Sequence, residues 1–152
     1  MNIVLVEPEI PQNTGNIART SALTCSTLHL VRPLGFSLED RYLKRAGLDY
    51  WEHVRLIEWD SFDDLVKAHA GSRFYLATTR TDCTYDQVRY EPGDFLVFGK
   101  ETAGLPADIL AMFPESHIRI PMLNLGRSLN LSNSVAIVLY EALRQQGFPG
   151  LR

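Results

Sequence analysis

Short apolar segments alternate with helix-like segments along almost the whole chain, and this alternation is the feature that most restricts its fold. Two parallel strands need a connection that crosses back over the sheet, and this connection is usually a helix. Strands that are separated by helices therefore tend to pair in parallel, with the helices covering both faces of the sheet. We therefore predict an α/β fold with a mostly parallel sheet and helices on both faces. The predicted strands are residues 2–6, 27–31, 54–59, 73–78, 95–98 and 118–122, and the predicted helices are residues 14–25, 39–46, 61–70, 106–113 and 131–146.

Single residues set several of these boundaries. Pro8 and Pro11 predict an extended loop after the first strand, and Thr14 is then the expected cap of the first helix. Ser61 and Asp64 stand in near capping-box positions at the start of another predicted helix.

Side-chain donors and acceptors gather at three junctions between a strand and a helix. The clusters lie in residues 13–19, 96–106 and 118–141. The third carries Ser128, Asn130, Ser132, Asn133 and Ser134. Helix capping explains about two of these five side chains, so the others need another partner. Because ligands of open α/β sheets bind beyond the carboxyl ends of the strands, we expect the three clusters to form one composite site.

Length and composition indicate one globular domain spanning residues 1–152, since 45% of the residues are hydrophobic and 22% are charged. A net charge of -3 argues against coating of nucleic acid by bulk electrostatics, although a local basic patch stays possible. No apolar run approaches the ~18 residues of a membrane span. The N-terminus lacks the features of a signal peptide, so we expect a cytoplasmic protein without membrane contact.

Several common kinds of site are poorly supported. Cys25 and Cys83 have no cysteine or histidine at ligand spacing, which predicts two free thiols and no metal. Gly99 and Lys100 do not form a P-loop, because no glycine stands five residues before them. No G-x-G-x-x-G follows the first strand and no G-x-S-x-G occurs, so neither a dinucleotide site nor a serine hydrolase is indicated.

The first cluster is suited to an anion. Gly15 permits close backbone approach at a helix start, and Arg19 could clamp a phosphate or a developing oxyanion. A capped helix with a surface arginine explains the same residues equally well. Likewise, Gly99 and Gly104 taken alone are explained as turn glycines.

Taken together, the three clusters resemble the motifs of the SPOUT superfamily of S-adenosylmethionine-dependent RNA methyltransferases, in its SpoU branch. The matching patterns are N-x-G-x-x-x-R from Asn13 to Arg19, L-V-x-G-x-E-x-x-G-L at residues 96–105, and I-P-M followed by S-L-N-x-S between Ile120 and Ser132. Each pattern is weak alone, but their order and spacing are highly specific. With no RNA-binding extension, the chain is most similar to the branch that methylates the 2′-hydroxyl of C34 or U34, the wobble nucleotide of tRNA.

This resemblance implies a C-terminal trefoil knot, a homodimer with active sites at the subunit interface, and tRNA as partner. It also implies that S-adenosylmethionine binds in the knot and that no metal takes part. The implied catalytic residues are Arg19, Asn13 and Glu101. The implied cofactor-binding residues are Ala77, Thr78, Gly99, Ile120, Met122, Ser128, Leu129 and Asn130.

The implied reaction is in-line transfer of the sulfonium methyl group to a ribose 2′-hydroxyl. A ribose hydroxyl is a poor nucleophile at neutral pH, so its proton must be taken or shared. Because a guanidinium resists deprotonation, we expect Arg19 to be an anion clamp and leave the base open, with Glu101 as a candidate. The alternatives are methylation of another tRNA or rRNA site, a non-catalytic cofactor-binding RNA-interaction protein, and an unrelated nucleotide-binding α/β domain.

Overall fold

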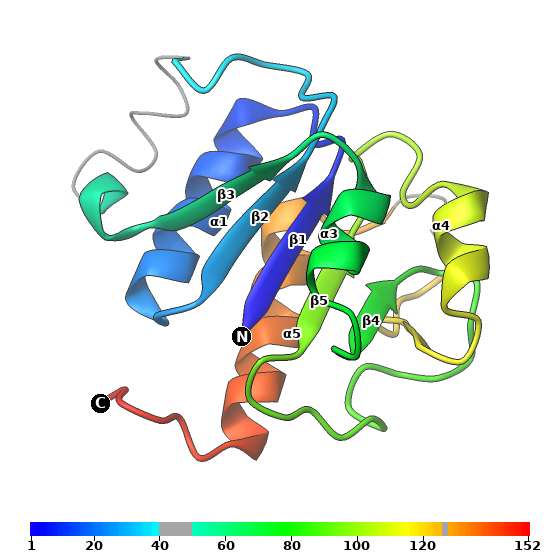
Figure 1. Cartoon of the computed structure of the whole chain (residues 1–152). Coiled ribbons are helices and arrows are strands. Elements are labelled where there is room, and N and C mark those ends of the chain that lie inside the picture. Colours follow the sequence, from blue (N-terminus) through cyan, green and yellow to red (C-terminus); the bar gives the residue numbers. More distant parts are fainter. Residues whose placement is uncertain (40–49, 126–127) are drawn as a thin grey trace.

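The structure, a computed structural model, describes residues 1–39, 50–125 and 128–152. Its centre is a six-stranded sheet in which every pairing is parallel and the strands follow the order β3-β2-β1-β5-β4-β6 (Figure 1). The predicted α/β fold with a parallel sheet is therefore confirmed. The strands are β1 (Asn2–Val6), β2 (Thr27–Val31), β3 (Arg55–Trp59), β4 (Phe74–Ala77), β5 (Phe95–Phe98) and β6 (His117–Ile118).

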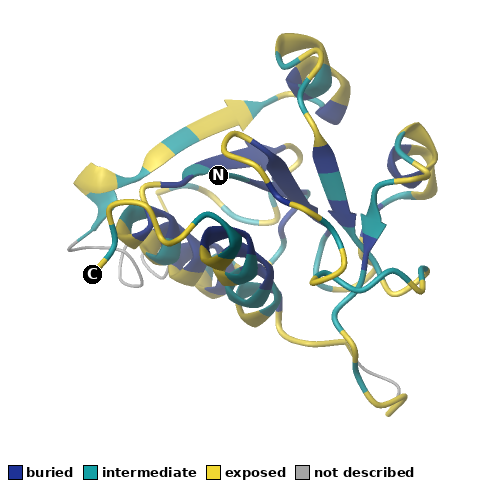
Figure 2. Cartoon of the chain, turned by 90° about the horizontal axis from the view of Figure 1, so that it is seen from below, coloured by how far each residue is buried: buried dark blue, intermediate teal, exposed yellow. Residues whose placement is uncertain are grey.

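Helices cover both faces of the sheet. Two of them, α1 and α5, lie side by side on one face, and α3 and α4 lie on the other (Figure 1, Figure 2). The predicted helix of residues 39–46 falls almost entirely outside the described residues. The helices are α1 (Pro11–Leu23), α3 (Phe62–Ala68), α4 (Ala107–Met112) and α5 (Leu131–Gln145), with a short 3-10 helix, η1, at Trp51–His53.

The side chains of β1 show why both faces need cover. Ile3 and Leu5 are fully buried in the core beneath α1 and α5, whereas Val4 and Val6 belong to the core beneath α3 and α4. Successive side chains of a strand point to opposite faces, so a strand that is apolar throughout has to be covered twice. Each such side chain contributes about 1.5–3 kcal/mol on burial, which keeps β1 at the centre of the sheet.

Helix α1 begins earlier than predicted. Pro11 stands in its first turn, where the missing N–H has no cost because the first amides of a helix have no intrahelical partner. The extended loop predicted over Pro8 and Pro11 is therefore limited to residues 7–10. The prediction that Thr14 caps this helix is wrong, because Thr14 is buried inside the helix and Ile10 takes the cap position.

Strand β6 is shorter than the predicted strand of residues 118–122. Its pairing with β4 ends at Ile118, and the next residue pairs with the connection between β4 and β5. There, Arg119 N–H donates to the Cys83 carbonyl and the Arg119 carbonyl accepts from Tyr85 N–H, both at 2.9 Å. Pro121 has no N–H with which to continue a ladder, so the chain leaves the sheet and lines a pocket instead.

Two helices begin at capping residues that the sequence indicated. Ser61 Oγ accepts from Asp64 N–H at 3.1 Å at the start of α3, which confirms the predicted cap. Asn130 Oδ1 accepts from Ser132 N–H at 2.9 Å at the start of α5. No helix within the described residues is both long enough and apolar enough to cross a membrane.

Candidate active site

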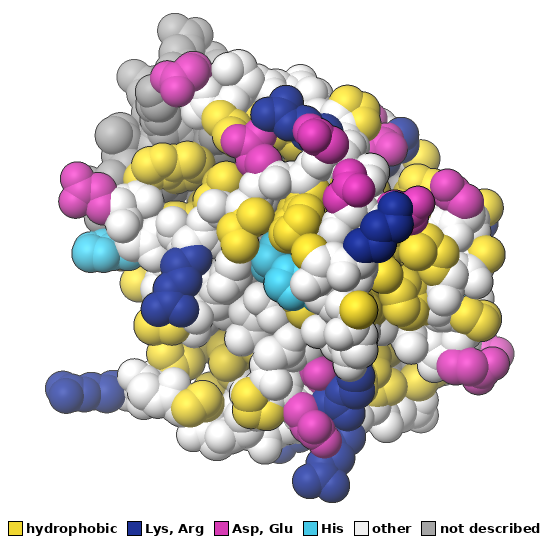
Figure 3. Space-filling view, viewed as in Figure 1, with side chains coloured by type: hydrophobic (Ala, Val, Ile, Leu, Met, Phe, Trp, Pro, Cys, Tyr) yellow, Lys and Arg dark blue, Asp and Glu magenta, His cyan; other side chains and the backbone are white. Residues whose placement is uncertain are grey.

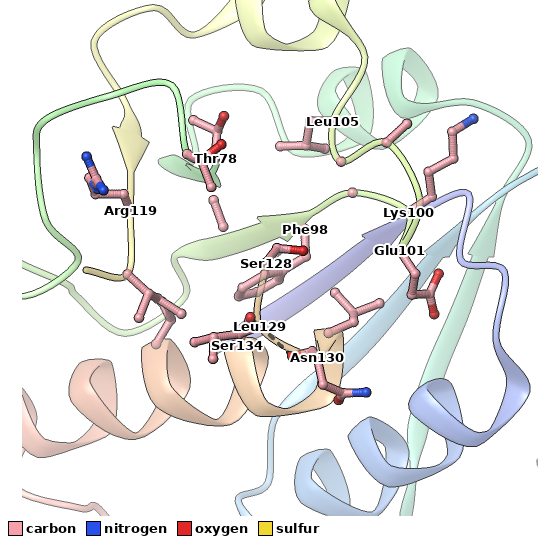
Figure 4. A pocket seen from close by; sticks show the side chains of 18 of the residues that line it. Thr78, Phe98, Lys100, Glu101, Leu105, Arg119, Ser128, Leu129, Asn130 and Ser134 are labelled. Carbon is pink, nitrogen blue, oxygen red and sulfur yellow. Dashed lines mark hydrogen bonds between the residues drawn. The ribbon is translucent and has the colours of Figure 1, made fainter. Parts of the chain in front are cut away.

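An open pocket of about 600 Å³ lies where the strands β4, β5 and β6 end. Its walls come from the segments that follow these strands and from the first turn of α5 (Figure 4). All of the residues predicted to bind the cofactor line it, and so do Asn13 and Glu101. The lining set that the sequence predicted is Ala77, Thr78, Gly99, Ile120, Met122, Ser128, Leu129 and Asn130.

The loop of residues 99–104 bends tightly enough to require glycine at both ends. A Cβ added at Gly99 would lie 2.0 Å from the Gly104 carbonyl carbon, so no other residue fits there. Gly104 has a φ of +70°, a left-handed conformation that L side chains rarely adopt, and its N–H donates to the Lys100 carbonyl at 2.8 Å. The turn presents backbone groups of this loop to the pocket.

Glu101 ties this loop to the segment between β1 and α1. Its carboxylate accepts from Glu9 N–H at 2.8 Å, from Ile10 N–H at 3.2 Å and from Asn13 Nδ2 at 3.0 Å. Hydrogen bonds to a carboxylate are shorter and stronger than those between neutral groups. Glu101 therefore holds the start of α1 against the pocket, and this geometry favours positioning over proton transfer.

Asn13 carries the connection on to the third cluster. It is 5% exposed, and its Oδ1 accepts from Asn130 Nδ2 at 2.9 Å. Asn130 is also the cap of α5, so one unbroken path of hydrogen bonds runs from Glu101 through Asn13 to that helix. The three polar clusters of the sequence thus meet at one site, as predicted.

Two acidic residues that sequence reasoning did not single out strengthen this junction. Glu7 accepts from Lys100 Nζ at 2.8 Å, and Glu9 accepts from Thr102 Oγ1 at 2.8 Å. Both residues lie in the segment after β1, and the loop of residues 99–104 follows β5. These two segments lie opposite each other because β1 and β5 are neighbours in the sheet. The sequence around Glu7 and Glu9 indicated only a loop. Their partners could not be predicted, because the sequence of one strand does not show which strand lies beside it.

Arg19 is the one predicted catalytic residue that does not line the pocket. It is exposed, its guanidinium lies 4.8 Å from the centre of the Tyr50 ring, and its Nη2 donates to the Tyr50 hydroxyl at 3.4 Å. A stacked, solvent-facing guanidinium can still bind an anion from outside the chain. Tyr50 was not predicted, because its partner is 31 residues away in the sequence.

The site has the chemistry of an organic-ligand pocket. No group of three or more metal-ligating side chains occurs among the residues that the structure describes. Instead, the walls combine apolar side chains with backbone groups and a few polar side chains, which is the usual lining of a cofactor pocket of this size.

The architecture and the pocket together define the class of protein. The chain belongs to the SpoU rRNA Methylase family, which matches residues 1–140. The resemblance to the SpoU branch that the sequence motifs indicated is therefore confirmed.

Individual relatives narrow this class. The tRNA (cytidine(34)-2'-O)-methyltransferase of Methylovorus glucosotrophus is 51% identical over 150 residues, which cover 98% of this chain and 97% of that protein. A solved structure concerned with 2-OH methylation of C/U34 on tRNA is 47% identical, with a TM-score of 0.91, and covers 96% of this chain and 95% of that chain. The AdoMet-bound rRNA methyltransferase of Sinorhizobium meliloti is 25% identical, with a TM-score of 0.83, over 94% of this chain and 55% of that chain.

Proposed function

We propose that this chain is a tRNA methyltransferase that transfers a methyl group from S-adenosylmethionine to the ribose 2′-hydroxyl of C34 or U34. The observation that carries the proposal is the match, over nearly the full length of both chains, to proteins described by that activity. The pocket supports it independently, because the three motif clusters enclose it. We place the reaction in the cytoplasm and treat residues 1–152 as one domain, since a single sheet joins both cores.

The residues around the pocket fit S-adenosylmethionine. A volume of about 600 Å³ is in the range of cofactor sites, and the loops at Gly99, Ile120 and Leu129 offer backbone donors and acceptors to an adenine ring. Bound there, the cofactor supplies an electrophilic sulfonium methyl group. The chain itself orients the site, with Asn13 and Glu101 holding the loops and Arg19 stabilising negative charge on the RNA.

We further propose that the active protein is a homodimer in which Arg19 of one subunit serves the pocket of the other. Arg19 is exposed and outside its own pocket, so a complete site needs a second copy. Leu123 and Leu125, beside the pocket, are 81% and 82% exposed, and Tyr140 on α5 is 46% exposed. Apolar side chains as exposed as these favour a surface that a partner covers.

The C-terminal segment is proposed to form the trefoil knot of the family, an exception to the rule that chains avoid knots. The connection between β4 and β5 holds the C-terminal part of the chain at two separate points. One is the pairing of Arg119 with Cys83 and Tyr85. The other is Gln145, whose Nε2 donates to the Val88 carbonyl at 3.0 Å and whose Oε1 accepts from Tyr90 N–H at 2.9 Å.

RNA contact is proposed to be local rather than spread over the surface. On the face shown in Figure 3, the described Lys and Arg side chains are interspersed with Asp and Glu. With a net charge of -3, affinity then has to come from a few phosphate contacts and from the shape of an unpaired loop. An anticodon loop offers both ribose and base edges on a compact stem.

The test is mass-spectrometric mapping of 2′-O-methyl nucleosides in RNA from cells with and without this chain. We expect loss of the methyl group at position 34 of one or more tRNAs, and its restoration by purified protein with labelled S-adenosylmethionine. If anticodon loops were unchanged and a ribosomal RNA site lost its methyl group, the wobble assignment would be wrong although the chemistry would stand.

The dimer has a separate test. An Arg19→Ala chain and a chain with Gly99→Val, which blocks the turn of the pocket, are each expected to be inactive. Mixed through unfolding and refolding, the two should regain activity, because some dimers then hold one intact composite site. Failure of every mixture to regain activity, with mixed dimers verified by mass spectrometry, would count against sharing of the site.

A further inference from the structure

We propose that Arg80 and Arg119 form an oxyanion subsite of the pocket, which binds the carboxylate at the amino-acid end of the cofactor. This inference rests on the proposed function, because it takes S-adenosylmethionine to be the ligand. It adds a binding role for two residues that lie outside the three motif patterns.

The first observation is a surplus of positive charge on one wall. Within the described residues, three cationic side chains line the pocket: Arg80, Lys100 and Arg119. Lys100 is neutralised by Glu7 at 2.8 Å. Arg80 is exposed and forms no side-chain hydrogen bond or ion pair with any described residue.

The positive charge of Arg119 is almost as poorly compensated as that of Arg80. Its one acidic neighbour among the described residues, Asp82, lies 3.9 Å away and is fully exposed to solvent. An ion pair with that exposure contributes little, because solvent screens it. The guanidinium also donates to the Thr81 carbonyl, but at a long 3.5 Å. Both arginines therefore retain donors for an external anion.

The second observation is that the charges are separated across the pocket. Arg119 lies on the opposite side from Lys100 and Glu101 (Figure 4). Arg80 and Arg119 are close in the fold, because Arg80 follows β4, Arg119 follows β6, and these two strands are paired. A ligand that bears an anionic group at one end can therefore be bound in only one direction.

The chemistry of the wall favours a carboxylate. The planar guanidinium fork matches the two oxygens of a carboxylate, and S-adenosylmethionine carries one such group and no phosphate. A smaller hollow lined by Thr79, Arg119 and Met122 adjoins the pocket, and Ser128 lines both spaces and adds a hydroxyl donor. The side chain of Arg119 is only 31% exposed, which suits a small ligand better than the backbone of an RNA.

The experiment compares two ligands that differ only in the carboxylate. Calorimetry without RNA measures the Kd of S-adenosylmethionine and of decarboxylated S-adenosylmethionine for the wild-type chain, Arg80→Met, Arg119→Met and Arg89→Met. Arg89 is the matched control, because it is an exposed arginine of the same connection that does not line the pocket. Binding of tRNA without cofactor is measured for the same four proteins.

The wild-type chain is expected to bind the carboxylate-bearing ligand at least about tenfold more tightly, since hydrogen bonds between charged groups are among the strongest in proteins. Arg80→Met and Arg119→Met should each reduce that preference several-fold, mainly by weakening the parent cofactor, and Arg89→Met should leave it intact. Arg80 has no partner to lose, so its variant remains informative if Arg119→Met fails to fold.

Two results would overturn the inference while leaving the proposed function standing. One is a wild-type protein that binds both ligands equally, or a preference that Arg80→Met does not change. The other is an unchanged preference with weakened tRNA binding, which would assign the arginines to RNA phosphate. A wild-type protein that binds neither ligand would instead overturn the proposed function itself.

Discussion

Asn13 and Arg19 on helix α1 stand in different surroundings, although both belong to one sequence motif. At its start, Asn13 is buried and bonded to Glu101 and Asn130. Six residues later, Arg19 is exposed, and its guanidinium forms a cation–π contact and a hydrogen bond with Tyr50. Six residues turn an α-helix by roughly 600°, so the two side chains point in directions about 120° apart. In this chain the motif therefore brings Asn13, but not Arg19, to the pocket.

This contrast separates residues that build the site from residues that act beyond it. The side chains of Asn13, Glu101 and Asn130 are hydrogen-bonded to one another and to backbone amides inside the chain. Arg19 keeps most of its five donors free for an external anion. Substitutions in the first group should affect cofactor binding and stability, whereas substitution of Arg19 should affect transfer.

The largest expected effect comes from Arg19→Ala. Loss of a donor to developing negative charge lowers enzymatic rates by about 100- to 1000-fold, and we expect at least the lower figure for methyl transfer to tRNA. The Kd of S-adenosylmethionine should stay within a few-fold, because Arg19 does not line the pocket. Single-turnover kinetics and calorimetry measure the two quantities, with Arg89→Ala as control. A loss of cofactor affinity that matched the loss of rate would erase the distinction between Asn13 and Arg19.

The next largest effect is a loss of stability in acid, and it is expected from His29 in a buried polar cluster far from the pocket. His29 on β2 is 1% exposed, and its Nδ1 accepts from Trp59 Nε1 at 3.0 Å. Burial, with a smaller contribution from the charge of His69, lowers the pKa of His29 from 6.5 to about 4. The neutral ring is therefore the form that fits the core.

The sign of the pH effect follows from that depressed pKa. Between pH 6.5 and about 4 the unfolded chain binds the proton that folded His29 refuses, so its contribution to stability is complete above pH 6.5 and is lost on acidification. The full difference corresponds to about 3 kcal/mol. Urea unfolding at a series of pH values should show this loss, reduced in His29→Asn and retained in the exposed control His53→Gln. An equal acid loss in His29→Asn would assign the effect to other groups.

Much of the fold was predictable because its signals are local. Strand β5 matches its predicted residues 95–98, which form a short apolar run, and β2 matches residues 27–31, which alternate polar and apolar side chains. The cap at Ser61 was read from a side chain and an amide three residues apart. One composite site was predicted because the three polar clusters follow the ends of strands, and parallel strands bring their ends together, whereas the individual cofactor-binding residues came only from the resemblance to the SPOUT superfamily.

The features that escaped prediction depend on contacts between distant parts of the chain. Strand β6 ends at Ile118 because Arg119 pairs with Cys83 and Tyr85 instead, a choice that no local pattern reveals. Thr14 is typical of a cap, yet Pro11 starts the helix first and packing buries Thr14. The clasp of Glu9 on Thr102 joins residues 93 apart, which single-sequence patterns do not connect.

A smaller effect distinguishes a cap at the pocket from a cap elsewhere. Asn130→Ala and Ser61→Ala each remove a capping side chain, so each should lower the free energy of unfolding by about 1 kcal/mol. Only Asn130 also lines the pocket and bonds to Asn13, so only Asn130→Ala should weaken S-adenosylmethionine binding as well, by several-fold. Denaturant melts and calorimetry on both variants measure this. Equal cofactor affinities would show that the path from Glu101 to α5 does not position the site.

The smallest effect concerns the support of Arg19 by Tyr50. An exposed cation–π contact is worth about 0.5–1 kcal/mol, so Tyr50→Leu should lower methyl transfer by roughly two- to five-fold and leave cofactor affinity unchanged. Tyr50→Phe keeps the ring and loses only a long hydrogen bond of 3.4 Å, so it should rescue most of the rate. In an Arg19→Ala background, Tyr50→Leu should have no further effect, because a positioning residue acts only through the group that it holds. A full additional loss in that background would mean that Tyr50 contacts the RNA itself, and the surface around Arg19 would then carry two independent contacts instead of one supported arginine.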